Sequence, residues 1–271
     1  MTGTWMLALA DIRSATHRRW LLVVTAIGIV AIGVVAALAF GSASGLARTD
    51  RWHAGVAGVV LLVGLLVAMG LGATALSRDG DSGFFGMLHV AGARREVLAI
   101  ARVLARVAEL AVVIAVWALT TQIGSLALGL GLDGPLAVHL LTMSLNLAIV
   151  ALVAAAASAI VGRGSSSFLA LVTYVGMQSF SRLGNAADQH LIVSWGGASQ
   201  AIRTILPRFI TSPLITDLQN RGKGGPVAPR DNVGGAVALA HVSNLSAILW
   251  TLLWCATLAA LAVNGMRRRA L

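Results

Sequence analysis

The sequence predicts an all-α integral membrane protein with six transmembrane helices, and two observations carry this prediction. Of the 271 residues, 58% are hydrophobic and only 11% are charged, whereas a soluble domain of this length needs far more charge to cover its surface. In addition, six stretches lack Asp, Glu, Lys and Arg and are long enough, or nearly so, for the roughly 20 residues that a crossing takes. They run from Trp20 to Ala47, Trp52 to Ser77, Leu110 to Leu132, Leu136 to Gly162, Gly164 to Ser181 and Val242 to Met266.

Basic residues flank these stretches and predict their orientation. The net charge is +10, with 20 residues that are Lys or Arg. With six spans, one side of the membrane receives most of the Arg residues of the short segments: Arg13, Arg18, Arg19, Arg78, Arg94, Arg95, Arg102, Arg106, Arg163, Arg267, Arg268 and Arg269. Such an excess marks the cytoplasmic side, so both termini of this multi-pass protein of the inner or plasma membrane are expected in the cytoplasm. Because the charge lies at the ends of apolar runs, no nucleic-acid partner is expected.

Residues 1–19 are expected to form a helix that lies in the membrane interface. Trp5, Leu9 and Ile12 recur at helical spacing, while Arg13 lies off that stripe. A helix with this pattern places its apolar face in lipid and its charges toward the headgroups. The alternative is that these residues are simply the cytoplasmic start of the first span.

The cytoplasmic segment 78–96, between the second and third expected spans, combines charged, Gly and apolar residues. From Arg94 onward helical periodicity resumes, which predicts a short amphipathic element, a Gly break and then a helix that feeds the third span. Exposed apolar residues in a cytoplasmic loop commonly mark a docking site for another protein. The alternative, given equal weight, is a loop folded against the protein's own helices.

The long segment 182–243, expected on the outer side of the membrane, is more than a simple loop. Apolar residues recur at helical spacing around Phe209 and Ile210, and Pro207 and Pro213 interrupt the pattern. This arrangement predicts two short helices packed at the outer membrane surface. The residues that follow are polar and rich in Gly and Pro.

The missing residue types exclude several classes of function. A phosphate-binding loop needs a Lys followed by Ser or Thr after a Gly-rich run, whereas the only Lys, Lys223, precedes Gly224. The chain is therefore not expected to be an ATPase, and no other enzyme site emerges. The six His residues are scattered without metal-ligand spacing, so we expect neither a metal site nor a cofactor bound by this chain. The single cysteine, Cys255, excludes a disulfide within the chain.

The expected spans also lack the residues on which ion-coupled transport depends. None of them contains Asp, Glu, Lys or Arg, and a proton- or ion-coupled carrier usually holds such residues in the membrane as relays or ligands. The polar residues Gln122, Asn146, Gln178 and Asn264 are interpreted as hydrogen-bonding partners between helices. A secondary transporter is therefore disfavoured, and the energy for any transport has to come from elsewhere.

Segment 79–106 contains an ordered series of acidic, Gly, apolar and basic positions: Asp79, Asp81, Gly83, Met87, Leu88, Arg94 and Arg95. With this series and with its six-span plan, the chain resembles the type-2 ABC transporter permeases. It is most similar in size and plan to the subgroup of the permease that serves copper-site maturation of nitrous-oxide reductase. Two positions depart from the family pattern, because Ala91-Gly92 replaces a frequent Pro and Phe84 stands where Thr is common.

The resemblance implies a membrane-bound assembly with two kinds of protein partner. A second permease copy pairs with the first, as a homodimer, and each docks a separate ATPase subunit that binds ATP and Mg. The implied contacts with the ATPase are Asp79, Asp81, Gly83, Phe85, Leu88, Arg94 and Arg95, and the candidate external gate is Phe209 with Ile210. The implied function is export of a substrate through the dimer interface. The alternative is mechanotransmission, in which ATPase strokes reach an outer partner and nothing crosses.

Overall fold

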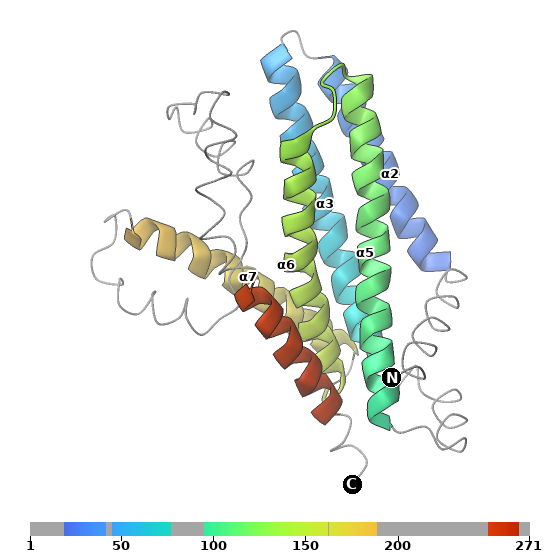
Figure 1. The fold of residues 1–271 in the computed structure, drawn as a ribbon, viewed down its shortest axis with the longest axis vertical. Helices are drawn as coiled ribbons and strands as arrows, with labels where there is room; N and C mark the ends of the chain where they lie inside the picture. The colour runs from blue at the N-terminus through green and yellow to red at the C-terminus, as the bar shows by residue number, and fades with distance from the viewer. Residues whose placement is uncertain (1–18, 42–44, 77–94, 162, 189–248, 266–271) are drawn as a thin grey trace. The chain divides into compact units, whose positions relative to one another are not determined.

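The computed structural model describes residues 19–41, 45–76, 95–161, 163–188 and 249–265 (Figure 1). Over these ranges the chain is helical, without a strand, which confirms the all-α expectation for them. The helices are α2 (Arg19–Phe40), α3 (Gly45–Ala75), α5 (Arg95–Ala127), α6 (Gly134–Ser158), α7 (Arg163–Asp188) and Leu249–Gly265. The expected interfacial helix, most of segment 78–96 and the external segment beyond residue 188 lie outside the described residues.

Three of the described helices are long and apolar enough to cross a membrane. They are Trp20–Phe40, Ala47–Ala75 and Gly134–Ser158, and they coincide with the first, second and fourth expected spans. The third stretch lies in α5 only as far as Ala127, where this helix ends, and the fifth lies within α7. Neither helix meets the same measure over its described residues. The sixth is represented by a shorter apolar helix, Leu249–Gly265. These long apolar helices indicate a membrane-embedded protein.

Helix α3 starts before the bound expected from the sequence, because charged residues do not end it. The second expected span began at Trp52, yet α3 is already helical from Gly45 and includes Arg48 and Arg51. Long Arg side chains can keep their charge at the membrane surface while the backbone remains helical. The Arg48 guanidinium also lies 5.5 Å from the centroid of the Phe40 ring, a cation–π contact with α2.

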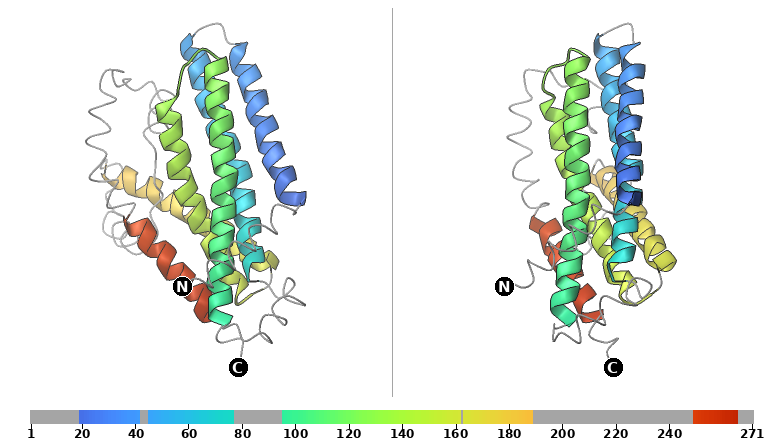
Figure 2. Two further views of the ribbon diagram at one scale, coloured as in Figure 1. Left: turned by 45° about the vertical axis from the view of Figure 1, so that its right-hand side comes forward. Right: turned by 90° about the vertical axis from the view of Figure 1, so that its right-hand side faces the viewer.

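The described residues fall into two compact units. The first unit contains α2, α3 up to Ala68, α5 from Leu104 and α6 up to Leu147. Within it these helices run side by side (Figures 1 and 2). The closest approach involves Gly28 of α2, where an added Cβ would overlap the indole of Trp117 on α5. The Trp117 Nε1–H also donates a hydrogen bond of 3.2 Å to the Thr25 carbonyl, so α2 and α5 are joined by packing and by a polar contact.

The face of α2 away from these contacts is apolar and exposed. Six of its aliphatic side chains are each more than half exposed: Leu22, Val23, Ile27, Val30, Val34 and Leu38. A contiguous row of this kind is rare on soluble monomers, where it marks an interaction surface. On a helix of this length and composition the natural partner is lipid, which agrees with a membrane-embedded protein.

The second unit is built mainly by close packing of small residues. It contains the ends of α3 and α5 beyond the first unit, α6 from Ala148, α7 and Leu249–Gly265. An added Cβ at Gly72 would overlap the carbonyl oxygen of Ala151 on α6. At the end of α3, the Leu76 N–H donates to Ser158 Oγ at 3.3 Å. Small side chains allow helix backbones to approach closely, which is how helices associate in membranes.

Candidate functional site

Most residues predicted to contact an ATPase or to form a gate lie outside the described residues: Asp79, Asp81, Gly83, Phe85, Leu88, Arg94, Phe209 and Ile210. Of the predicted coupling residues, Arg95 alone is placed, as the first residue of α5. From there α5 continues as one helix of 33 residues to Ala127. The helix expected after the Gly break and the third apolar stretch are therefore a single element.

The polar site that the structure does describe lies in the first unit, at the corner between α5 and α6. The end of α5 closes in a Schellman motif, with Gly129 at φ 73° in the left-handed region. The Leu130 N–H donates to the Ser125 carbonyl and the Gly129 N–H to the Leu126 carbonyl, both at 3.0 Å. A side chain would strain the backbone at Gly129, so the sequence determines where α5 stops.

Asp133 directly precedes α6, and both its side chain and its backbone form hydrogen bonds. Its Oδ1 accepts the Leu136 N–H at 3.0 Å, which makes it the N-cap of the helix. The Gln122 side chain of α5 clamps the Asp133 peptide groups in both directions. Gln122 Oε1 accepts the Asp133 N–H at 3.0 Å, and Gln122 Nε2 donates to the Asp133 carbonyl at 3.1 Å. Gln122 therefore forms hydrogen bonds from α5 to the start of α6, as its interpretation as a hydrogen-bonding residue expected.

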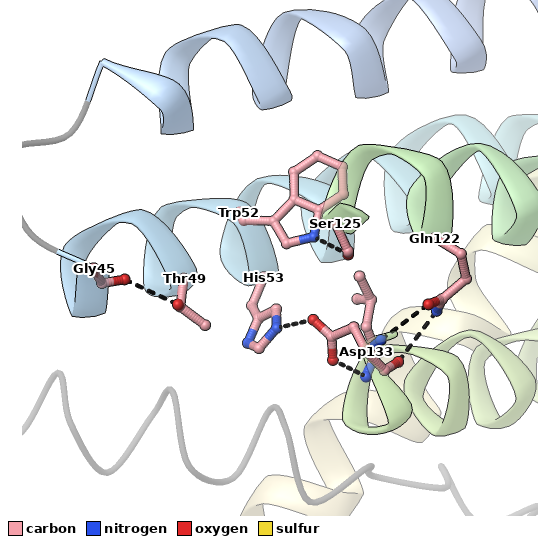
Figure 3. Close-up of polar contacts among 8 residues, drawn as sticks. Gly45, Thr49, Trp52, His53, Gln122, Ser125 and Asp133 are labelled. Carbon is pink, nitrogen blue, oxygen red and sulfur yellow. Dashed lines mark hydrogen bonds and ion pairs between the residues drawn. The ribbon is translucent and has the colours of Figure 1, made fainter. Parts of the chain in front are cut away.

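Neighbouring residues of α3 reach the same corner (Figure 3). His53 Nε2 lies 2.5 Å from Asp133 Oδ2, and both side chains are almost fully buried. The adjacent Trp52 is completely buried and donates from Nε1 to Ser125 Oγ at 2.8 Å. Asp133 therefore forms hydrogen bonds with both α3 and α5, and the bond between Trp52 and Ser125 joins these two helices separately.

The electrostatics of the corner favour an ionised Asp133. Burial alone would raise the pKa of its carboxyl group, but the hydrogen bond to His53, the Leu136 N–H and the charge of His53 outweigh burial and lower this pKa below its ordinary value. The stabilisation is therefore present above the pKa of an unfolded Asp and is lost as the pH falls through the lower folded value. His139 of α6, also buried, lies close enough to His53 for their charges to interact.

Sequence reasoning missed the pairing at this corner although the residues were visible. The separation of 80 residues between His53 and Asp133 leaves no local pattern that joins them. The available signal was Asp133 itself, a preferred N-cap residue with Pro135 following shortly after it. Among the described residues, no group of three or more His, Cys, Asp and Glu side chains is arranged to hold a metal ion. What the corner can do chemically is pair charge and fix three helix ends.

A second buried polar contact lies within α5. Arg106 Nη1 donates to Glu109 Oε1 at 2.6 Å, and both side chains are at least 95% buried. From the sequence alone, Glu109 is expected only at the inner edge of the third span, three residues after Arg106. Buried charges of this kind are stable only when paired, so the two residues act as one neutral unit in the first compact unit.

Comparison with known proteins adds no relative to this description. No protein-family model and no curated protein matches the sequence.

Proposed function

We propose that this chain is the transmembrane permease subunit of an ATP-driven ABC exporter. In this proposal two copies pair in the membrane, and each binds a separate ATPase subunit through the cytoplasmic segment 78–96. The observation that carries the proposal is the continuity of α5, which starts at Arg95 within that segment and extends unbroken to Ala127. The resemblance of the preceding residues to the type-2 permeases supplies the identity of the partner.

A continuous helix is the physical requirement for coupling at a distance. At about 1.5 Å per residue, α5 is about 50 Å long, which exceeds the hydrocarbon thickness of about 30 Å. A displacement applied by an ATPase near Arg95 would reach the far end of α5 with little loss, because a helix moves as a rigid element. The buried Arg106–Glu109 pair lies on this path and joins successive turns of the same helix.

The proposal includes six spans with both termini in the cytoplasm. In a Cys255→Ser background, single cysteines at Ser44 and Arg268 should react with membrane-impermeant maleimide from outside and from inside, respectively. The reason is the Arg excess of the short segments, which marks the cytoplasmic side. Labelling of intact cells, compared with labelling after permeabilisation, measures the difference. Reaction of the cysteine at position 268 in intact cells would contradict this topology.

The proposed external gate is tested by crosslinking between the two permease copies. A cysteine at Phe209 or Ile210 should form a disulfide with its counterpart in the resting state, and trapping with ATP and vanadate should change the yield at least about twofold, since opening requires these residues to move. Nonreducing gels of the permease purified with its ATPase give the yield. A cysteine at Leu22, on the exposed face of α2, serves as a control for random collision. The gate is excluded if neither position crosslinks in any nucleotide state.

A further inference from the structure

The part of the α5–α6 hairpin that follows Glu109 buries its only charged residue. Between Glu109 and Arg163 the sequence contains a single Asp, Glu, Lys or Arg, which is Asp133. This residue sits in the turn of the hairpin, where most proteins expose polar groups to water, yet it is only 8% exposed and pairs with His53. The other titratable residue between Glu109 and Arg163 is His139, and its exposed fraction is 2%.

What the turn exposes instead is apolar. Leu132 is 79% exposed, the highest value among the large apolar side chains that the structure describes. The exposed residues Ile123 and Leu126 lie on one face of α5, and Val138 and Leu141 lie on one face of α6, in each case at helical spacing. The apolar surface therefore runs from α5 through Leu132 to α6 without a charged interruption.

The backbone of the turn is also suited to a poorly hydrated environment. Hydrogen bonds within the corner satisfy the N–H groups of Leu128, Gly129, Leu130, Asp133 and Leu136. A chain in contact with lipid must satisfy its polar groups internally, and these bonds meet that requirement for the five N–H groups. The Schellman motif, the Gln122 clamp and the Asp133 cap together supply these partners.

We infer that the corner formed by residues 126–138 rests in the lipid interface and that the His53–Asp133 pair makes this placement possible. The Asp133 carboxyl group is buried and hydrogen-bonded to His53, and a buried, hydrogen-bonded carboxyl group can lie where an isolated carboxylate cannot. Lipid is the occupant because the exposed surface continues the apolar face of α6, a helix long and apolar enough to cross a membrane. About 28 Å of helix, at about 1.5 Å per residue, separates Glu109 from the corner, close to the thickness of the hydrocarbon layer.

Collision measurements on a spin label test the placement directly. A nitroxide on a cysteine at Leu132, in the Cys255→Ser protein reconstituted in phosphatidylcholine and phosphatidylglycerol vesicles, should collide more often with oxygen than with a water-soluble nickel chelate. The same label at Arg51, an exposed charged position of α3, should show the opposite preference. Frequent nickel collisions at position 132 would place the corner in water. Low collision rates with both reagents would mean that protein covers it, and either result overturns the inference. Since no ATPase is needed, the test is independent of the proposed transport function.

The role of the charge pair is tested on the same labelled protein. His53→Gln removes the imidazole that bonds the Asp133 carboxyl group, so nickel collisions at position 132 should rise severalfold. Adding Asp133→Asn removes the charge that lost its partner and should return the collision rate most of the way to the starting value. An unchanged rate in the His53→Gln protein, with the label otherwise mobile as before, would show that the pair does not determine where the corner lies. A rise that Asp133→Asn fails to reverse would show that unfolding, not charge, exposed the corner.

Discussion

If the proposed function holds, replacing both Phe85 and Leu88 with Asp is expected to abolish recovery of the ATPase subunit with this chain. Each buried apolar anchor contributes about 1.5–3 kcal/mol, so their joint loss weakens binding by about 3–6 kcal/mol, which corresponds to at least about a hundredfold in Kd. The measurement is co-purification of the proposed ATPase subunit, with a tag on this chain. Permease yield and helix content should remain unchanged, because the substitutions lie outside the apolar helices.

A matched variant separates loss of docking from the effect of added charge. Ser82→Asp with His89→Asp adds the same two carboxylates to segment 78–96 but leaves both apolar anchors in place. This variant should retain most of the ATPase. If the ATPase co-purifies undiminished with the Phe85 and Leu88 double variant, the segment packs against its own protein, and the coupling proposal fails.

The second large effect is expected at the buried ion pair of α5. Glu109→Ala leaves the Arg106 guanidinium buried without its carboxylate, a change that typically costs about 3–5 kcal/mol of stability. In detergent, the midpoint of thermal unfolding followed by circular dichroism should fall clearly. Val112→Ala, one turn along the helix at an exposed position, should change stability by less than about 0.5 kcal/mol.

A double variant identifies charge as the cause. Arg106→Met combined with Glu109→Leu removes both charges and keeps most of the volume, so it should recover much of the stability that Glu109→Ala loses. Equal losses in the single and double variants would instead show that the shape of the site, not its charge balance, stabilises the helix.

Sequence reasoning predicted the elements better than it predicted their contacts. Apolar runs located α2, α3 and α6 because a membrane imposes a length and a composition on every crossing. The helix after Arg94 was predicted from periodicity, and α5 begins at Arg95. The start of α3 was placed too late, since charges at Arg48 and Arg51 were taken as a boundary although a helix can continue through the interface.

The contacts of the polar corner cannot be predicted from local sequence patterns. Gln122 was correctly interpreted as a hydrogen-bonding residue between helices, but its partner, the Asp133 peptide, depends on how the turn closes. The contacts of His53 with Asp133 and of Trp52 with Ser125 join residues 80 and 73 positions apart. Such pairs follow from the packing of α3 against the hairpin, and no spacing rule reports them.

The long separation of His53 and Asp133 has a consequence for biogenesis. Asp133 is synthesised 80 residues after His53, so the whole of α3 exists before the carboxylate that pairs with His53. When the hairpin of α5 and α6 then enters the bilayer, it carries an acidic residue whose insertion on its own is unfavourable, by an amount that decreases toward the membrane surface. An α3 already in place offers the imidazole that offsets this cost. The order in which the helices are synthesised therefore matters. Because α3 is made first, it can accept the later hairpin, and insertion of α5 and α6 is expected to be favoured once α3 is in place.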